Sequence, residues 1–336
     1  MKFGMIGGGS WATALAKILT DNGNTIHWYI RNEKTIGYLQ KRRHNPHYLG
    51  AAYFDIAQIK LSSNIAEVVN SADVLVVAVP SAYAKDTLEQ LPKDALSGKK
   101  IVSAIKGILP HSNQLLHEYL HEAFAFQLKD YFTVLGPCHA EEVAAEKLSY
   151  LTFSGLNTQT AGQIAAHFKT EYINTVVNHD VLGVQYAAVL KNIYALGAGI
   201  AHGLEYGDNF LSVYIANAAR EMSGFLKEIL VVATAENTDE TVDYAASVYL
   251  GDLLVTCYSL YSRNRTFGNM IGKGYSVKAA QLELNMVAEG YNASKCIFHT
   301  NQYLKANLPI ATTIYHILWE HLPADEGFKT IENALM

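Results

Sequence analysis

Short apolar runs alternate with stretches of helical spacing over the first half of the chain. Residues 2–6 form a strand-like run, and Trp11, Leu15 and Leu19 then recur at the spacing of one helix face. Further strand-like runs occupy residues 25–30, 73–80, 100–104, 131–135, 150–153 and 172–177. The run at 73–80 is almost wholly apolar, as expected for a central parallel strand. This alternation predicts a doubly wound, mainly parallel α/β sheet.

The pattern changes near residue 180. From Val181 onward helical spacing dominates, and one long helix is expected from Asp180 towards Ile200 despite the glycines at 183, 197 and 199. No low-complexity linker marks the change. We therefore expect an α/β domain over residues 1–180, packed closely against an all-α domain over residues 181–336.

Composition narrows the classes of protein. Of the 336 residues, 50% are hydrophobic and 17% are charged, which is typical of a globular protein with sizeable cores. The net charge of −5 argues against a nucleic-acid partner. No run is apolar enough to span a bilayer, and no secretory signal is evident at the N-terminus. The chain has three cysteines, Cys138, Cys257 and Cys296, which are far apart and odd in number. They suggest no disulfide framework, so a reducing cytoplasm is expected.

Three consecutive glycines separate the first expected strand from the first helix. The segment from Gly7 to Ala12 matches the dinucleotide-binding pattern G-x-G-x-x-G/A. Gly7 would permit the tight turn, Gly9 would let a pyrophosphate approach the backbone, and Ala12 would let helix and strand pack closely. Ser10 and Trp11 open the helix, whose N-terminus attracts anions. An ordinary glycine-rich turn is the alternative, and the strand–loop–helix context favours the dinucleotide.

The end of the second strand bears on the choice of nucleotide. Many NAD-binding folds have an acid there, whereas this chain has Arg31 and Asn32. An arginine at this point can pair with a 2′-phosphate, which favours NADP without excluding NAD. Glu33 lies close by and keeps both cofactors open. A solvated charge at the start of the next helix is the alternative interpretation of Arg31.

A zinc-protease pattern, H-E-x-x-H, occurs at His117, Glu118 and His121. On a helix the two histidines share a face, and the glutamate can act as a general base. However, the segment falls where a doubly wound sheet has a covering helix, and Leu116 and Leu120 suit packing. No third ligand follows at a standard spacing. A surface helix with two ordinary histidines is therefore favoured, and a zinc hydrolase is a minor alternative.

Cys138 and His139 lie beside two glutamates and suggest a cysteine nucleophile. A nucleophile needs a base positioned in space, which adjacent residues rarely provide. We interpret this segment as the start of a helix, with Glu141 and Glu142 complementing the positive end of the helix dipole.

Eight segments together resemble the bacterial NAD(P)-dependent glycerol-3-phosphate dehydrogenases, and they occur in the order of that family. They are GGGSWATALA at 7–16, NPHYL at 45–49, AIKG at 104–107, GPCHAEE at 136–142, GVQYAAVLKNIYALGAG at 183–199, GDLLVTC at 251–257, SRNRTFG at 262–268 and VAEGY at 287–291. The resemblance covers nearly the whole chain. It implies a Rossmann domain, an all-helical second domain, an active site between them, an NAD(P)H cofactor and often a dimer.

The resemblance also implies a catalytic lysine at Lys191. A lysine inside an otherwise apolar helix is costly unless it is paired or functional, although a long side chain can also reach the surface. By family position Lys191 accepts the proton when glycerol 3-phosphate is oxidised, and Asn192 orients the substrate. Lys106 would lie near both substrate and nicotinamide and lower the pKa of Lys191. Asp252 matches an acid of the substrate site.

Phosphate binding is assigned by family position to a polar cluster near residue 262. A hydroxyl, guanidinium groups and an amide lie within four residues, and arginine can bind phosphate through two parallel hydrogen bonds. The resemblance implies that Ser262, Arg263 and Asn264 bind the phosphate and that Arg263 also contacts the cofactor. Further implied contacts are Gly136 and Cys138 to substrate, and Gly7, Gly9, Ser10, Trp11, Arg31, Lys106, Ala140, Val287 and Glu289 to cofactor.

Some residues depart from the family pattern. Alanine replaces a glycine at Ala12, and Cys138 replaces a serine or threonine, although a thiol is a weaker donor than a hydroxyl. Residues 235–240 are the expected position of an inserted loop. The expected reaction interconverts sn-glycerol 3-phosphate and dihydroxyacetone phosphate, which supplies phospholipid synthesis. The alternatives are a two-domain β-hydroxyacid dehydrogenase, against which the phosphate cluster argues, and a nucleotide-binding sensor, against which Lys191 argues.

Overall fold

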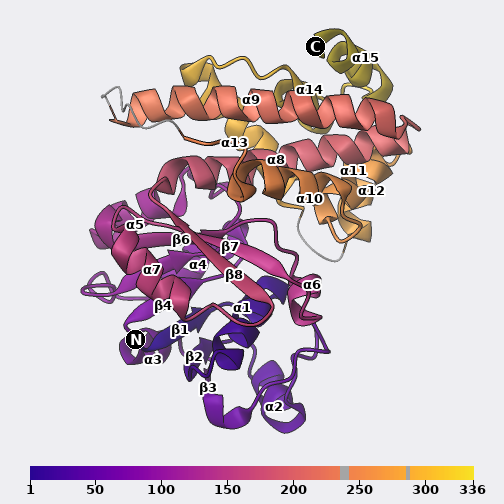
Figure 1. The fold of residues 1–336 in the computed structure, drawn as a ribbon. Coiled ribbons are helices and arrows are strands. Elements are labelled where there is room, and N and C mark those ends of the chain that lie inside the picture. Colours follow the sequence, from indigo (N-terminus) through magenta and orange to yellow (C-terminus); the bar gives the residue numbers. More distant parts are fainter. Residues whose placement is uncertain (235–241, 285–287) are drawn as a thin grey trace. The chain divides into compact units, whose positions relative to one another are not determined.

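The computed structural model describes residues 1–234, 242–284 and 288–336. The chain forms two compact units (Figure 1). The first comprises residues 1–105 and 114–181, and the second comprises residues 106–113 and 182–336. The short segment 106–113 therefore leaves the first half of the sequence to pack with the second unit.

The first unit is built on one sheet of eight strands in the order β3-β2-β1-β4-β5-β6-β7-β8. The strands are β1 Phe3–Ile6, β2 Ile26–Tyr29, β3 Ile59–Ser62, β4 Val74–Val77, β5 Lys100–Ser103, β6 Tyr131–Leu135, β7 Ser149–Ser154 and β8 Ile173–Asn178. All neighbouring pairs are parallel except β6 with β7. The first six strands follow the 3-2-1-4-5-6 order of dinucleotide-binding sheets. The predicted doubly wound α/β fold is confirmed.

Helices cover both faces of this sheet. Phe3 and Met5 of β1 belong to the apolar core that also contains the inner face of α1. On the opposite face, Gly4 lies so close to Val68 of α3 that a Cβ atom would be 3.2 Å from its side chain. The helices of this unit are α1 Ser10–Asp21, α2 Glu33–Arg42, α3 Ile65–Ser71, α4 Ser81–Leu88, α5 Leu116–Phe124, α6 Ala140–Ala144 and α7 Thr158–Ala166, with short 3-10 turns η1 Ile56–Gln58 and η2 Leu128–Asp130.

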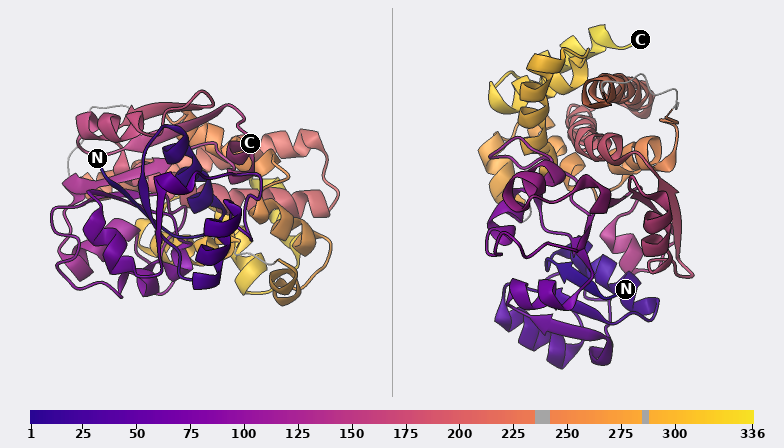
Figure 2. Two further views of the ribbon diagram at one scale, coloured as in Figure 1. Left: turned by 90° about the horizontal axis from the view of Figure 1, so that it is seen from below. Right: turned by 90° about the vertical axis from the view of Figure 1, so that its left-hand side faces the viewer.

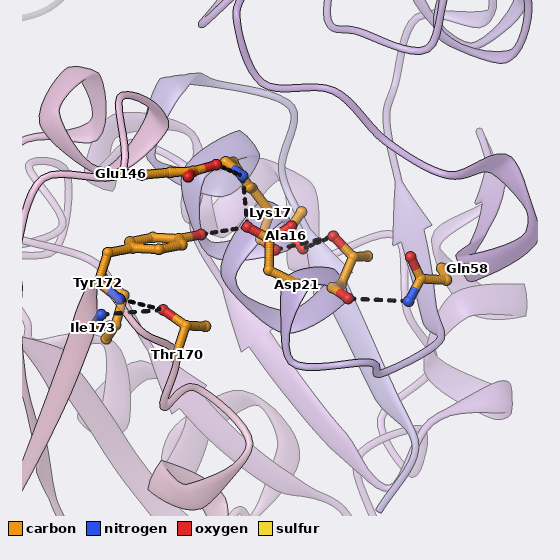
Figure 3. Close-up of polar contacts among 9 residues, drawn as sticks. Ala16, Lys17, Asp21, Gln58, Glu146, Thr170, Tyr172 and Ile173 are labelled. Atoms are coloured by element: carbon orange, nitrogen blue, oxygen red, sulfur yellow. Dashed lines mark hydrogen bonds and ion pairs between the residues drawn. The ribbon is translucent and has the colours of Figure 1, made fainter.

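The C-terminal end of α1 is anchored by a cluster of polar side chains (Figure 3). Lys17 is buried and pairs with Asp21 at 2.5 Å and with Glu146 at 3.0 Å. The Tyr172 hydroxyl, from just before β8, donates to the same Asp21 carboxylate at 2.5 Å. These contacts tie the end of α1 to the segments that precede β7 and β8.

The described part of residues 182–336 is built from helices (Figure 2). They are α8 Val181–Gly203, α9 Asp208–Thr234, the π-helical turn η3 Ser247–Gly251, α10 Asp252–Tyr258, α11 Arg263–Gly272, α12 Val277–Glu283, α13 Glu289–Leu304, α14 Pro309–Trp319 and α15 Ala324–Ala334. The long helix expected from Asp180 towards Ile200 is α8, which ends three residues further on. Within the described ranges, no helix is long and apolar enough to cross a membrane.

The edge strand β3 was not predicted. Its four residues, Ile59–Ser62, include only two apolar positions, and only Ile59 is buried. Tertiary pairing with β2, in register over the whole strand, creates this strand rather than its own hydrophobic pattern.

Candidate active site

The glycine loop follows β1 at the point where the strand order of the sheet reverses. Gly7 has φ +130°, and a Cβ atom there would lie 2.7 Å from the carbonyl oxygen of Ala78, just after β4. Both facts require glycine. Ligands of open α/β sheets bind in the crevice beside such a reversal, outside the carboxyl ends of the strands.

The next residues of the loop suit a pyrophosphate. Gly9 is the N-cap of α1, and a Cβ atom at this position would meet no protein atom within 4 Å. The backbone is therefore open at the point where the first turn of α1 presents N–H groups, and the helix dipole favours an anion there. Ala12 is fully buried against the core, so a small residue is needed. Ser10 is buried and Trp11 half-buried in the same first turn.

Asn45 is a site residue that sequence reasoning did not single out. Its amide nitrogen donates to the Gly8 carbonyl at 3.1 Å and to the Thr13 hydroxyl at 2.9 Å, and the side chain is buried. Asn45 therefore holds the glycine loop against α1. In the sequence, Asn45 stands out only as the first residue of the NPHYL segment at 45–49, to which the resemblance assigns no role.

Arg31 is exposed two residues after β2, at the carboxyl edge of the sheet. Asn32 caps α2 by accepting hydrogen bonds from two backbone N–H groups of its first turn. The carboxylate of Glu33 accepts a hydrogen bond from the Ser63 hydroxyl at 3.1 Å. Glu33 is thus engaged with its own unit, whereas the Arg31 side chain projects towards solvent.

The segment after β6 carries three of the expected contact residues. Gly136 has φ +132°, and a Cβ atom there would lie 2.9 Å from the Tyr150 carbonyl oxygen, so glycine is required. The Cys138 thiol is buried and donates to that same carbonyl at 3.1 Å. Ala140 is the first residue of α6 and is buried. Cys138 therefore connects this segment to β7. Its thiol hydrogen, a weak donor, is used within the protein.

The expected catalytic lysine lies in an ion pair in the second unit. Lys191, in the middle of α8, is 3% exposed, and its ammonium group pairs with Oδ1 of Asp252, the first residue of α10. Burial is the main influence on Lys191 and lowers its pKa from 10.5 to about 8. The carboxylate of Asp252 opposes this decrease, and the positive charge of Lys106 adds to it. The arrangement produces an amine that can exchange a proton near neutral pH.

Asp252 itself keeps one oxygen available. Its Oδ2 is buried and accepts no hydrogen bond from the described residues. A buried carboxylate oxygen without a donor is unfavourable, and a hydroxyl group of a ligand would satisfy it. The π-helical turn η3 directly precedes Asp252, and such turns often occur at functional sites.

Close backbone packing between α8 and α11 places the expected phosphate-binding residues, 262–264, relative to Lys191. A Cβ atom at Gly268 of α11 would lie 1.9 Å from the carbonyl oxygen of Leu196 in α8, and one at Gly199 of α8 would lie 2.0 Å from that of Arg265. The glycines therefore let the two helices approach backbone to backbone. Ser262 is the N-cap of α11, and its hydroxyl accepts from the Arg265 N–H at 3.3 Å.

Hydrogen bonds connect several of the remaining expected site residues to this helix pair. Arg263 and Asn264 form the first turn of α11, and the Asn264 amide donates to the side chain of Asn192 at 2.9 Å. The Asn192 amide donates to the carbonyl of Lys106 at 2.9 Å. Glu289 is the first residue of α13. Val287 lies outside the described residues, as does the expected insertion at 235–240.

The H-E-x-x-H segment has a structural role in this fold. It forms α5, where the carboxylate of Glu118 accepts a hydrogen bond from the backbone N–H of Leu115 at 2.6 Å and thereby caps its own helix. His121 faces the carbonyl of Phe126 at 3.3 Å. No group of three potential metal ligands occurs among residues 1–234, 242–284 and 288–336. The structure gives the zinc-hydrolase alternative no support.

The fold and this set of side chains define a class. A glycine loop at the reversal of a 3-2-1-4-5-6 sheet is typical of dinucleotide-dependent enzymes, and a buried lysine with a lowered pKa is typical of a proton-transfer site. The chain thus has the features of a nucleotide-dependent dehydrogenase.

Comparison with known proteins identifies the family. Residues 2–161 match the family described as NAD-dependent glycerol-3-phosphate dehydrogenase N-terminus, and residues 180–329 match the corresponding C-terminus. Glycerol-3-phosphate dehydrogenase [NAD(P)+] of a Thermoanaerobacter species is 35% identical over 95% of this chain and 93% of its own length. The protein of the same name from Chlorobium limicola is 32% identical over 97% and 96%. The chain belongs to the NAD-dependent glycerol-3-phosphate dehydrogenase family.

Solved structures agree on the fold. Glycerol-3-phosphate dehydrogenase from Coxiella burnetii superimposes with a TM-score of 0.86 at 24% identity, covering 98% of each chain. The yeast enzyme GPD1 superimposes with a TM-score of 0.80 at 23% identity, covering 99% of each chain.

Proposed function

We propose that this protein interconverts sn-glycerol 3-phosphate and dihydroxyacetone phosphate with NAD(P)(H). The observation that carries the proposal is the buried pair of Lys191 and Asp252, in which the lysine has a pKa of about 8. Oxidation of the C2 hydroxyl requires a base, and reduction of the ketone requires an acid. A group with a pKa near the working pH serves in both directions.

Lys191 acts on the C2 oxygen of the substrate. In the oxidation direction the neutral amine accepts the hydroxyl proton, and in the reduction direction the ammonium returns it. Asp252 holds the ammonium in place through its Oδ1, and the unsatisfied Oδ2 accepts a substrate hydroxyl. Lys106 contributes positive charge near Lys191, which favours the neutral amine.

The first turn of α11 binds the substrate phosphate. Arg263 supplies a guanidinium group that can donate two parallel hydrogen bonds to phosphate oxygens. Ser262 and Asn264 flank it at the N-terminus of this helix, where the helix dipole also favours an anion. Gly136 and Cys138 are the further substrate contacts that we propose from family position.

The first unit binds the cofactor, which supplies hydride exchange through its nicotinamide ring when bound. Gly7, Gly9, Ser10 and Trp11 surround the open backbone at the N-terminus of α1, which supports a pyrophosphate site there. The exposed Arg31 supports acceptance of a 2′-phosphate, and hence NADP as well as NAD. Lys106, Ala140, Arg263, Val287 and Glu289 are the remaining cofactor contacts that we propose.

Wider aspects of the proposal follow from the family. Residues 1–180 serve as the cofactor domain and residues 181–336 as the substrate domain. The enzyme works in the cytoplasm, forms a homodimer and supplies glycerol 3-phosphate to phospholipid synthesis.

The test is an assay of dihydroxyacetone phosphate reduction with NADH and with NADPH, compared with unphosphorylated ketoacids. We expect Lys191→Ala to slow turnover by about two to four orders of magnitude, the usual contribution of a general acid–base group. Lys17→Met is the matched control, because it removes another buried lysine outside the proposed site. Wild-type turnover by Lys191→Ala would show that the assigned role is wrong.

A further inference from the structure

Two buried asparagines connect four segments of the second unit. Asn192 on α8 is 4% exposed and Asn264 on α11 is 7% exposed. The Asn192 amide nitrogen donates to the carbonyls of Lys106 at 2.9 Å and Ala188 at 3.0 Å. Its Oδ1 accepts from the Asn264 amide nitrogen at 2.9 Å, and Asn264 Oδ1 accepts from the Gly290 N–H at 2.9 Å. The chain of hydrogen bonds thus runs from the 106–113 segment through α8 and α11 to α13.

Backbone groups at both ends fix the direction of this chain. The Gly290 N–H can only donate, so it must face the oxygen of the Asn264 amide. The Asn264 amide nitrogen is then turned to the oxygen of Asn192. The Asn192 nitrogen is in turn left facing two carbonyls, which can only accept. Both amide orientations therefore follow from the main chain and need no further assumption.

The hydrogen-bonding capacity of Asn192 limits what it can do for a ligand. An amide nitrogen has two hydrogens, and both are used by backbone carbonyls here. Asn192 therefore has no donor left for the substrate while these bonds persist. Packing reinforces the arrangement, since a Cβ atom at Gly290 would lie 2.5 Å from the Asn192 carbonyl oxygen.

We propose that Asn192 and Asn264 are positioning residues that act as one amide relay, which holds the backbone of Lys106 beside Lys191 and fixes the first turn of α13. This inference rests on the proposed function and changes the role of Asn192 from substrate contact to support. Asn264 uses one amide hydrogen in the relay and keeps the second for the substrate phosphate. The residue it positions is Lys106, whose charge favours the neutral form of the Lys191 amine. Loss of either amide interrupts the same chain.

A double-mutant cycle in kcat/KM tests the relay with the wild type, Asn192→Ala, Asn264→Ala and the double variant. Residues that act through one network give strongly non-additive effects. We expect the double variant to retain kcat/KM for dihydroxyacetone phosphate within roughly threefold of the worse single variant. Two independent substrate contacts would instead give a loss equal to the product of the two single losses, and that result would overturn the relay.

The pH profile of glycerol 3-phosphate oxidation supplies a readout that general loosening of the fold would not move. The charged groups that act on the Lys191 amine are Asp252 from α10 and Lys106 from the 106–113 segment. Cys257 of α10 also interacts with Lys191, but burial raises the pKa of its thiol to about 12, so the thiol stays neutral. If the backbone of Lys106 is released, its charge withdraws and the pKa of Lys191 rises. Both single variants should therefore shift the acidic limb of kcat/KM to higher pH.

Asn301→Ala is the matched control. Its amide donates to the Ala306 carbonyl at 2.9 Å and accepts from the Ala306 N–H at 2.8 Å, at the other end of α13. The substitution should lower the stability of the protein and leave the acidic limb of kcat/KM at its wild-type pH. An unmoved limb in both Asn192→Ala and Asn264→Ala would contradict the relay.

Failure of the relay is distinguishable from failure of the proposed function. A wild-type protein without activity on dihydroxyacetone phosphate refutes the function alone. Urea unfolding of the same four proteins then tests the relay without turnover. The relay predicts that the unfolding midpoint of the double variant falls by less than the sum of the two single decreases, and a decrease equal to that sum would overturn it.

Discussion

Replacing Asp252 by asparagine should change the pH at which this enzyme oxidises glycerol 3-phosphate. The substitution keeps the size of the side chain and an oxygen next to the Lys191 ammonium, but it removes the negative charge. In the wild type, Asp252 opposes the lowering of the Lys191 pKa by burial and by Lys106. Without that carboxylate only the two lowering influences remain, so the pKa must fall.

The size of the shift can be worked from the wild-type balance. The pKa of Lys191 is about 8 with the carboxylate present. An opposite charge within hydrogen-bonding distance typically shifts a pKa by about 1 to 3 units. We therefore expect a pKa of about 5 to 7 in Asp252→Asn. Because the neutral amine is the base in oxidation, the acidic limb of kcat/KM should move to lower pH by the same amount.

The assay is the initial rate of nicotinamide reduction at low glycerol 3-phosphate concentration, across the pH range in which the protein stays folded. kcat/KM reports the pKa values of the free enzyme, so substrate binding does not obscure the result. Asp21→Asn is the matched control, since it removes the carboxylate that pairs with Lys17, a second buried lysine. The control limb should stay near the wild-type position. An Asp252→Asn limb that stays there too, or moves to higher pH, would refute the assignment of Lys191 as the base.

Three further variants test the phosphate-binding turn and the close packing of helices. Arg263→Ala should raise KM for dihydroxyacetone phosphate by on the order of ten- to a hundredfold, the loss expected for hydrogen bonds to a charged group. The KM for unphosphorylated dihydroxyacetone should stay the same. An unchanged KM for the phosphorylated substrate would contradict the phosphate assignment. Gly268→Ala should lower the free energy of unfolding by about 1–3 kcal/mol, because its Cβ atom would lie 1.9 Å from a carbonyl oxygen of α8. Gly162→Ala in α7, where a Cβ atom meets nothing within 4 Å, should raise it by about 0.5–1 kcal/mol, and equal urea midpoints for both variants would count against close backbone packing.

The glycine loop and the main strands were predictable because each depends on local sequence. β1 and β4 are apolar runs, and Gly7 follows β1 directly. β3 was missed because its pattern is weak and pairing with β2 creates it. The H-E-x-x-H segment shows the opposite case, in which a strong local pattern misleads. Its place between two strands, its leucines and the missing third ligand argued against zinc, and the structure shows that Glu118 caps its own helix.

The connections within the proposed site could not be derived from the sequence. Lys191 was conspicuous as a lysine in an apolar helix, but its partner Asp252 is 61 residues away. The transfer of segment 106–113 to the second unit places Lys106 with α8, although it follows a strand of the first unit. Nothing in the spacing of Asn192 and Asn264 indicates that one amide donates to the other. Such contacts are set by helix packing, which in this unit depends on the glycines of α8 and α11.

The pKa of Lys191 results from opposing influences that come from different segments. Burial in α8 and the charge of Lys106 favour the neutral amine, and the carboxylate of Asp252 favours the ammonium. Each influence has its own structural support, because Asp252 follows a π-helical turn and Lys106 is held by Asn192. Loss of Asp252 and loss of the amide relay must therefore move the same kinetic limb in opposite directions. General damage to the fold cannot produce opposite shifts, so the pair of signs separates tuning of one lysine from loss of structure.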